Sequence, residues 1–273
     1  NSQYLYYKEK RRPDLIQCYL DSKNKNSLIA RGYYSGYRIS NRTAEQARAT
    51  LHLVPPIGGT GFSMSTKFLK EIGGYNCVSL TEDLEIQTIA TLKCRRVKFN
   101  KNARIYDEKP TRLEQSLVQR TRWAQGHWYL FIHYGWRLFF SLFNLKEIKF
   151  FFKKLDVLIY LSSKMVTCFS FILLMVQIPM LTIKNIPMIW PNVMMWTGVG
   201  FTILYYILII PITSLYDGSK QEKRKVLLEY FPNLLAMIVL GWIETMASIL
   251  GLLKHRQQSN WVKTSHNVTS MKN

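Results

Sequence analysis

Residues 110–123, PTRLEQSLVQRTRW, carry the strongest structural signal in this chain. Pro110 is followed by an apolar pattern that predicts a long helix. On that helix Gln119, Arg122 and Trp123 are spaced at i, i+3 and i+4, so they share one face. Such a face offers a guanidinium group that binds phosphate in a bidentate manner and an aromatic ring on which a sugar or a base can stack. The same residues are also compatible with an arginine-rich helix at a membrane edge, with the tryptophan as an interfacial anchor.

A second polar motif, Thr81-Glu82-Asp83, stands at the expected start of a helix over Glu82–Leu92. Either Ser79 or Thr81 can cap this helix. Glu82 follows Ser79 by three residues and is therefore expected to complete a capping box, as acidic residues are favoured in a first turn. Asp83 has no such structural role. It is the better candidate for a general base.

A glycine-rich segment, Gly58-Gly59-Thr60-Gly61, follows two prolines and predicts a loop. Glycine allows the backbone to approach a ligand closely. The segment is not a P-loop, because no Gly-Lys-Ser/Thr sequence follows it. A plain tight turn is the commoner explanation for a glycine cluster that stands alone.

The first part of the chain has an α/β pattern with few strands. A buried strand is expected around Leu15–Cys18, and two short strands are expected at Val97–Phe99 and Ile105–Tyr106. Helices are expected over Tyr33–Leu53 and Ser65–Ile72. These strands are fewer than a closed α/β domain needs.

The composition points to a membrane protein. The 273 residues include 37 Lys and Arg against 17 Asp and Glu, which gives a net charge of +20, and 48% of the residues are apolar, which excludes a disordered tail. Two stretches, 165–183 and 185–216, contain no charged residue, and a soluble domain rarely has two such runs. The four cysteines form no CxxC pair, so neither a disulfide framework nor a zinc site is expected.

Three consecutive segments account for the membrane region. Residues 129–154 combine aromatic bulk with lysines and predict an interfacial helix, although a core helix of a soluble domain shares this pattern. Residues 157–181 and 193–216 each exceed the ~20 residues needed to cross a bilayer. Basic clusters before the first span and after the second span predict that both of these flanks are cytoplasmic. Lys164, near the start of the first span, is expected to snorkel to the headgroups.

A third apolar stretch, 226–253, is ambiguous. It contains Glu229, Pro232 and Glu244. A crossing helix would place the basic residues after it outside, against the positive-inside bias. An interfacial or re-entrant helix is therefore favoured over a crossing one.

Taken together and in this order, the motifs resemble those of the processive membrane glycosyltransferases of family 2, the group that contains cellulose, hyaluronan and poly-N-acetylglucosamine synthases. The similarity extends from about Gln17 to His266, and the order and spacing of the motifs are more specific than any one motif. The residues that carry it are Gly58-Gly59-Thr60-Gly61-Phe62, Thr81-Glu82-Asp83, Gln119-Arg120-Thr121-Arg122-Trp123, the apolar spans and Trp261-Val262-Lys263-Thr264-Ser265-His266.

The resemblance implies a fold class and a chemistry. It implies the C-terminal part of a GT-A (Rossmann-like) α/β domain in the cytoplasm, followed by an interfacial helix and transmembrane helices. It implies an inverting transfer from a UDP-sugar, with Asp83 as the base that deprotonates the acceptor hydroxyl. It implies substrate contacts from Glu82, Gln119, Arg120, Arg122, Trp123, Gly58, Gly59, Thr60, Gly61 and Phe62. Gating or substrate binding is implied for Trp261, Thr264 and His266.

One feature of the family is missing from this sequence. The family carries an Asp-x-Asp motif that holds Mg²⁺ or Mn²⁺ on the diphosphate, and none of the six aspartates here belongs to such a motif. We therefore expect a C-terminal fragment of a longer enzyme, with no metal site of its own and with the cation ligands mainly upstream of residue 1. We also expect this fragment to be inactive alone.

The expected organisation has four parts. They are the GT-A part at 1–128, the interfacial region at 129–154, the membrane region at 155–253 and a cytoplasmic tail at 254–273. The expected location is the plasma membrane, with several spans and the catalytic part in the cytoplasm. The expected partners are a nucleotide-sugar donor, a glycan or lipid-linked acceptor and membrane lipids.

Two other classes of protein share some of these features. A nucleic-acid-binding protein would explain the net charge of +20, but the aromatic residues lie in apolar runs and no nucleic-acid motif is present, so no such partner is expected. A non-catalytic transport or scaffold subunit would explain Lys164 and Glu244 in apolar segments as pathway residues. It would leave the soluble part without a purpose.

Overall fold

The computed structural model describes residues 2–10, 12–180, 200, 204–205, 207–212 and 228–258. Most of the second expected span, 193–216, lies outside this range. So do Trp261, Thr264 and His266, and most of the expected tail at 254–273. The predictions made for those residues stay predictions.

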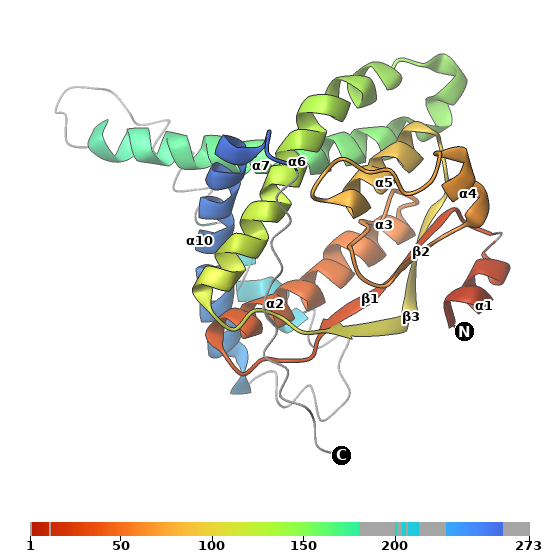
Figure 1. The fold of residues 1–273 in the computed structure, drawn as a ribbon. Coiled ribbons are helices and arrows are strands. Elements are labelled where there is room, and N and C mark those ends of the chain that lie inside the picture. Colours follow the sequence, from red (N-terminus) through yellow and green to blue (C-terminus); the bar gives the residue numbers. More distant parts are fainter. Residues whose placement is uncertain are drawn as a thin grey trace.

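The described strands form a small mixed sheet in the order β2-β1-β3 (Figure 1). Strand β1 (Leu15–Ser22) pairs with β2 (Phe62–Met64) antiparallel and with β3 (Val97–Asp107) parallel. The two short strands expected around Val97 and Ile105 are one continuous strand. Its register shifts where Cys18 pairs with Asn100 and the next residue, Tyr19, pairs with Arg104, so residues 101–103 bulge from the ladder.

A helical segment follows β1 and begins earlier than expected. Helix α2 (Leu28–Ser40) starts at Leu28 because the Ser27 hydroxyl accepts a hydrogen bond from the Ala30 amide at 3.1 Å. The helix then passes through a π-helical turn, η1 (Asn41–Gln46), into the short α3 (Ala47–Thr50). The sequence pattern did not reveal this π-helical turn.

Two of the expected helices are confirmed. Helix α4 (Thr66–Glu71) is capped by Ser65, and α5 (Glu82–Leu92) has the bounds that its sequence predicts. The expected capping box between Ser79 and Glu82 is wrong. Glu85 takes that role, and its Oε2 accepts the amides of Val78 at 3.0 Å and Ser79 at 2.8 Å.

The long helix expected after Pro110 is confirmed as α6 (Leu113–Ser141). It continues without interruption past residue 128, where the interfacial region is expected to begin. The turn η2 (Leu145–Phe150) leads into α7 (Phe151–Met180), which extends away from the sheet in Figure 1. Helix α10 (Tyr230–Lys254) lies alongside α2 and α6.

One hydrophobic core joins the sheet to the helices. Strand residues Leu15 and Val97 pack with Ile86 of α5, Leu130 of α6 and Leu161 of α7, all of which are buried. The N-terminal part of α7 is therefore anchored in the core of the α/β part. The sheet and the first candidate membrane helix form one packed unit.

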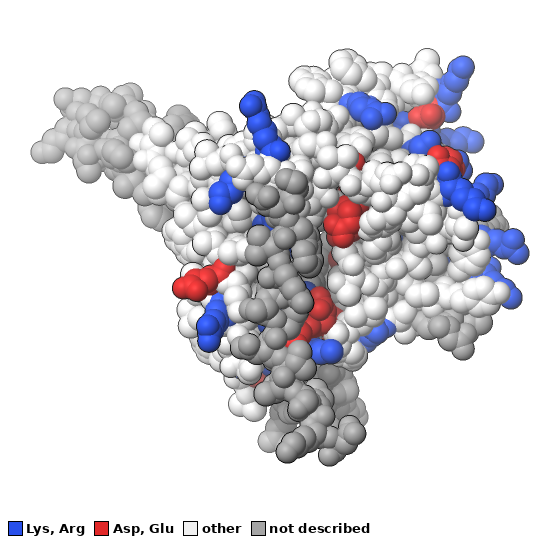
Figure 2. All heavy atoms as spheres, viewed as in Figure 1, with Lys and Arg blue, Asp and Glu red and all other residues white. Residues whose placement is uncertain are grey.

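Two helical segments of the described chain are long and apolar enough to cross a membrane, Leu145–Leu173 and Tyr230–Lys254. Their length and composition suit membrane-spanning helices and also the buried core helices of soluble proteins. In Figure 2 the described part of the projection formed by α7 is white, since residues 165–173 carry no charge. The described C-terminal half of α7, which carries no charge, therefore extends beyond the charged α/β part.

The docking of α10 on α6 depends on a small residue. A Cβ atom at Gly251 would lie 2.5 Å from the Ala124 Cβ, whereas a Cβ atom at Gly241 would meet nothing within 4 Å. We expect Gly251→Ala to lower the free energy of unfolding by about 1–3 kcal/mol through overpacking. We expect Gly241→Ala to raise it by up to about 1 kcal/mol through helix propensity. Thermal unfolding of both variants in detergent tests this, and equal effects would contradict the packing of α10.

Candidate active site

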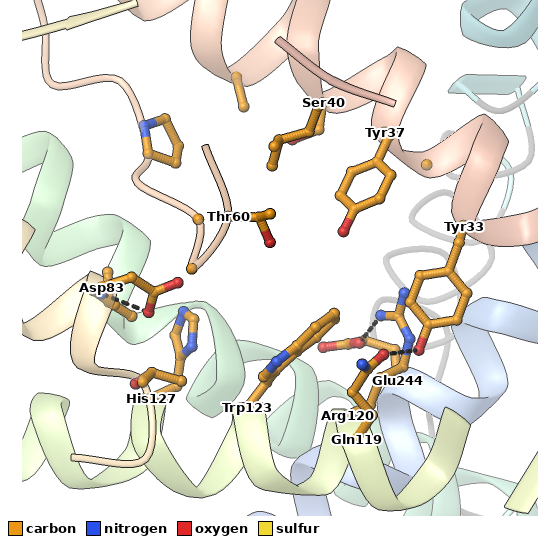
Figure 3. A pocket seen from close by; sticks show the side chains of 18 of the residues that line it. Tyr33, Tyr37, Ser40, Thr60, Asp83, Gln119, Arg120, Trp123, His127 and Glu244 are labelled. Atoms are coloured by element: carbon orange, nitrogen blue, oxygen red, sulfur yellow. Dashed lines mark hydrogen bonds and ion pairs between the residues drawn. The ribbon is translucent and has the colours of Figure 1, made fainter. Parts of the chain in front are cut away.

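A cavity of about 630 Å³ lies between the α/β part and the helices α7 and α10. Its wall brings together the loop Gly58–Thr60, the start of α5 and the middle of α6. Figure 3 shows Trp123 between Asp83 and His127 on one side and the pair of Arg120 and Glu244 on the other. Three motifs that are far apart in the sequence therefore face one space.

Asp83 lies in the first turn of α5. Its Oδ1 accepts the Leu84 amide at 2.7 Å. Burial raises the pKa of the Asp83 carboxyl to about 7, Glu82 adds to this shift, and Arg122 together with the Leu84 hydrogen bond opposes it. A carboxyl with this pKa can accept a proton near neutral pH.

The glycine-rich segment is divided between two roles. Gly58, Gly59 and Thr60 line the cavity, and a Cβ at Gly59 would lie 3.4 Å from the Asp83 Oδ2. Gly61 has a φ of +69°, and its Cβ would lie 2.2 Å from the Cys18 Sγ, so this glycine serves the turn and the packing on β1. Phe62 starts β2 and packs against the core.

Helix α6 contributes Gln119, Arg120, Arg122 and Trp123 to the cavity wall. The Tyr33 hydroxyl donates to the Gln119 Oε1 at 3.0 Å. The Arg120 guanidinium lies 4.6 Å from the centre of the Tyr33 ring and 5.6 Å from that of Trp123. All four residues of this motif that were predicted to bind substrate therefore line the cavity. Thr121, for which no role was expected, is buried elsewhere.

A charged cluster joins the three long helices. Glu244 of α10 forms ion pairs with both Arg120 of α6 and Lys164 of α7, and these side chains are 14–25% exposed. The expected snorkelling of Lys164 is therefore not observed, because its ammonium group is bound by Glu244. The sequence had marked both Lys164 and Glu244 as unusual charges in apolar stretches, but it could not pair them.

The cavity also contains residues that the sequence analysis missed. His127 lies one helical turn after Trp123, and its ring centre is 5.4 Å from that of Tyr160. Burial lowers the pKa of His127 to about 3, so the imidazole is neutral at physiological pH. The spacing i, i+4 from Trp123 could have revealed this residue. Asp107, at the end of β3, also lines the cavity, and from the sequence it is the next candidate for the base after Asp83. Nothing in the sequence indicated the others, which are Tyr33, Tyr37 and Ser40 on α2, Glu45 on η1 and Lys109 after β3.

The described residues do not fit a site for Mg²⁺ or Mn²⁺. No group of three His, Cys, Asp or Glu side chains is close enough to hold a metal within that part of the chain. Glu82 and Asp83 supply two carboxylates next to Gly59, which is short of the oxygen-rich set that these ions prefer. We therefore assign no metal to this cavity.

The comparisons with known proteins agree with one another. A family model described as glycosyl transferase family group 2 matches residues 3–252. The chain is also similar to the probable glycosyltransferase YdaM of Bacillus subtilis (strain 168), with 23% identity over 216 residues. The alignment covers 77% of this chain and 49% of that protein, so the chain spans about half the length of the curated relative it matches.

The charged cluster makes a testable contribution to stability. In Glu244→Gln, Arg120 and Lys164 keep their partly buried charges without a counter-charge, and we expect a loss in the free energy of unfolding that exceeds the ~1 kcal/mol typical of a surface pair. The control is Glu71→Gln, a carboxylate that also pairs with two cations, Lys93 and Arg95, which are 43% and 34% exposed, with an expected loss no larger than that of a surface pair. Thermal unfolding in detergent measures both, and losses of equal size would argue against a stabilising cluster at Glu244.

Proposed function

This chain belongs to glycosyl transferase family group 2, and we propose that it is part of a membrane-bound, inverting enzyme that extends a polysaccharide. Membership of the family implies a transferase with a GT-A fold that moves a sugar from a nucleotide-sugar to a glycan acceptor. We further propose that the donor is a UDP-sugar and that the enzyme is processive, like the cellulose, hyaluronan and poly-N-acetylglucosamine synthases. The role proposed for each residue follows.

The observation that carries the proposal is the shared cavity of Asp83, Arg122 and Trp123. A direct displacement needs a base on the attacking side and positive charge next to the leaving group. The cavity supplies a carboxyl with a pKa of about 7 and guanidinium groups from α6. The charges of Asp83 and Arg122 also interact with each other.

We assign the reaction to these residues as follows. The Asp83 carboxylate takes the proton of the acceptor hydroxyl while that oxygen attacks the anomeric carbon of the donor. The bond from this carbon to the diphosphate oxygen breaks, and the nucleoside diphosphate leaves with the electron pair. Arg120 and Arg122 balance the charge that develops on it. One displacement inverts the anomeric configuration.

The remaining motif residues bind the substrates in this proposal. Trp123 offers its ring to a sugar, and Gln119 is held by Tyr33 in an orientation that faces the cavity. Gly58–Thr60 lets the backbone approach the acceptor, and Glu82 lies beside Asp83. The roles of Trp261, Thr264 and His266 stay predictions for residues outside the described part of the chain.

Membrane association is supported by the two apolar helices and by an exposed aromatic face. Trp136, Phe140 and Phe143, at the C-terminal end of α6 and just after it, belong to one cluster of aromatic rings, and Phe152 of α7 is also exposed; these four side chains are 66–72% exposed. Lysines of η2 and α7 flank them, a combination typical of helices at a membrane interface. We propose a plasma membrane location with the cavity on the cytoplasmic side.

The complete activity is proposed for the longer protein to which the comparison points, since the chain spans about half of its curated relative. The donor-binding Mg²⁺ or Mn²⁺ and the inactivity of the isolated 273-residue chain stay predictions. A non-catalytic transport or scaffold role is the alternative. It is favoured if a variant at Asp83 transfers sugar as well as the original protein does.

Asp83 is the residue whose replacement tests the mechanism. We expect Asp83→Asn to lower sugar transfer by about 10²–10⁴-fold, since the amide cannot accept the proton. Because the pKa of Asp83 is raised to about 7, we expect kcat/KM of the original enzyme to fall about tenfold per pH unit below this value, as the carboxyl becomes protonated. Transfer of radiolabelled sugar from a UDP-sugar by the complete membrane-embedded enzyme, measured across pH, checks both.

The control for this experiment is Glu114→Gln, an exposed carboxylate on α6 that does not line the cavity. We expect it to retain activity and the same pH profile. Unchanged activity in Asp83→Asn, or a low-pH decline that persists in this variant, would favour either the non-catalytic alternative or another base, with Asp107 as the next candidate.

Membrane attachment can be tested separately from catalysis. We expect the protein to stay in the membrane fraction at about 1 M NaCl, where the Debye length is about 3 Å and surface charge attraction is screened. Detergent should release it, because the apolar helices hold it. Release by salt alone would favour a basic peripheral or nucleic-acid-binding protein.

A further inference from the structure

Glu45 is a buried carboxyl in the cavity wall that the mechanism above does not use. It lies in the π-helical turn η1 and is 8% exposed. Its Oε1 accepts a hydrogen bond from the Ser40 hydroxyl at 3.1 Å, while its Oε2 is buried without a hydrogen-bond partner. An unpaired buried polar atom of this kind is costly. Because Glu45 also lines the cavity, a rotation of its side chain brings this oxygen to a ligand there.

The backbone at Glu45 is held in place by a network at the start of η1. The Asn41 amide donates to the carbonyl oxygens of Leu20 at 2.6 Å and Tyr37 at 2.7 Å, and its Oδ1 accepts the Leu20 amide at 3.2 Å. These bonds tie the π-helical turn to strand β1. Such turns are rare and often occur at functional sites. The carboxyl is therefore presented on a fixed element.

Arg48, whose charge acts on Glu45, is bound to another carboxylate. Arg48 forms an ion pair with Asp156, with its Nε 2.9 Å from one carboxylate oxygen and 3.0 Å from the other. Its guanidinium also lies 5.6 Å from the centre of the Tyr160 ring. No ion pair is recorded for Glu45 among the described residues. Burial raises the pKa of Glu45 to about 7, so both of its protonation states occur near neutral pH.

Glu45 and Asp83 lie at the same end of the cavity. Tyr160 is within electrostatic range of both carboxyls, and His127 packs against the Tyr160 ring. All four side chains line the cavity. Ser40, which donates to Glu45, projects from the wall opposite α6 in Figure 3. The space between Glu45 and Asp83 is thus bounded by polar and aromatic groups.

Resting on the proposed function, we propose that Glu45 binds a hydroxyl group of the acceptor sugar and helps to determine which acceptor is used. The Oε2 atom accepts a hydrogen bond from a hydroxyl next to the one that Asp83 deprotonates. A carboxyl would repel the diphosphate of the donor, whereas the arginines that suit a diphosphate belong to α6. Glu45 therefore belongs to the acceptor side. Sites built to bond a hydroxyl discriminate strongly against analogues that lack it.

The test separates acceptor binding from the rest of the reaction. Using the complete membrane-embedded enzyme, transfer from UDP-glucose or UDP-N-acetylglucosamine to cellotetraose or chitotetraose is measured beside hydrolysis of the donor by water. We expect Glu45→Ala to raise the KM for the acceptor about 10- to 100-fold. Donor hydrolysis should not change, because water needs no acceptor site. Glu45→Gln, which keeps an oxygen acceptor, should restore most of the acceptor affinity.

The KM values for monodeoxy forms of a glucoside acceptor distinguish a direct hydrogen bond from a purely structural role of Glu45. We expect one deoxy position to weaken binding to the original enzyme and to have no further effect in Glu45→Ala. The matched control is Glu114→Gln, which should leave the KM for every acceptor unchanged.

Two results would overturn the inference. One is an unchanged KM for the acceptor in Glu45→Ala. The other is a Glu45→Gln variant that unfolds at the original temperature but loses donor hydrolysis to the same extent as sugar transfer. An original enzyme that transfers no sugar at all would instead refute the proposed function itself.

Discussion

The close contact between α5 and α6 is the constraint on which the site depends. A Cβ atom at Gly126 would lie 2.2 Å from the Thr81 Oγ1, so the absence of a side chain there lets α6 reach the start of α5. The Tyr134 hydroxyl donates to the Glu85 Oε1 at 3.0 Å further along the same contact. This packing brings Asp83 within electrostatic range of Arg122. A larger residue at Gly126 would separate the carboxyl from the arginines.

The apolar helices α7 and α10 contribute side chains to the wall of the cavity. Glu244 and Lys164 would each be costly in an apolar environment, but together with Arg120 they form one cluster at the cavity wall. The Trp128 indole also donates to the Ser248 carbonyl at 3.0 Å, which fixes α10 against α6. A change in how α10 packs would therefore alter the environment of Arg120. In the proposed reaction, substrate binding and membrane packing share these residues.

Much of the local structure could be predicted, and much of the site could not. The bounds of α5 and the N-terminal part of α6 follow from apolar periodicity, which local sequence encodes directly, whereas the continuation of α6 to Ser141 was not predicted. The π-helical turn depends on the bonds from Asn41 to β1, which no local pattern reveals. Glu85, and not Glu82, accepts the backbone amides of Val78 and Ser79 before α5, and the sequence spacing alone did not indicate this. The sequence did not indicate Glu45 either, because its place in the cavity wall and its burial arise only in the folded chain.

By itself, the sequence determined the order and spacing of the polar motifs, the positions of the apolar stretches and the resemblance to a family. These depend on residue type and spacing, which the chain carries without folding. The tertiary structure alone decided that Gly58–Thr60 faces the cavity while Gly61 and Phe62 support β1 and the core. It also decided that Lys164 faces Glu244. Such pairings depend on distances between helices, and those are set by packing over the whole molecule.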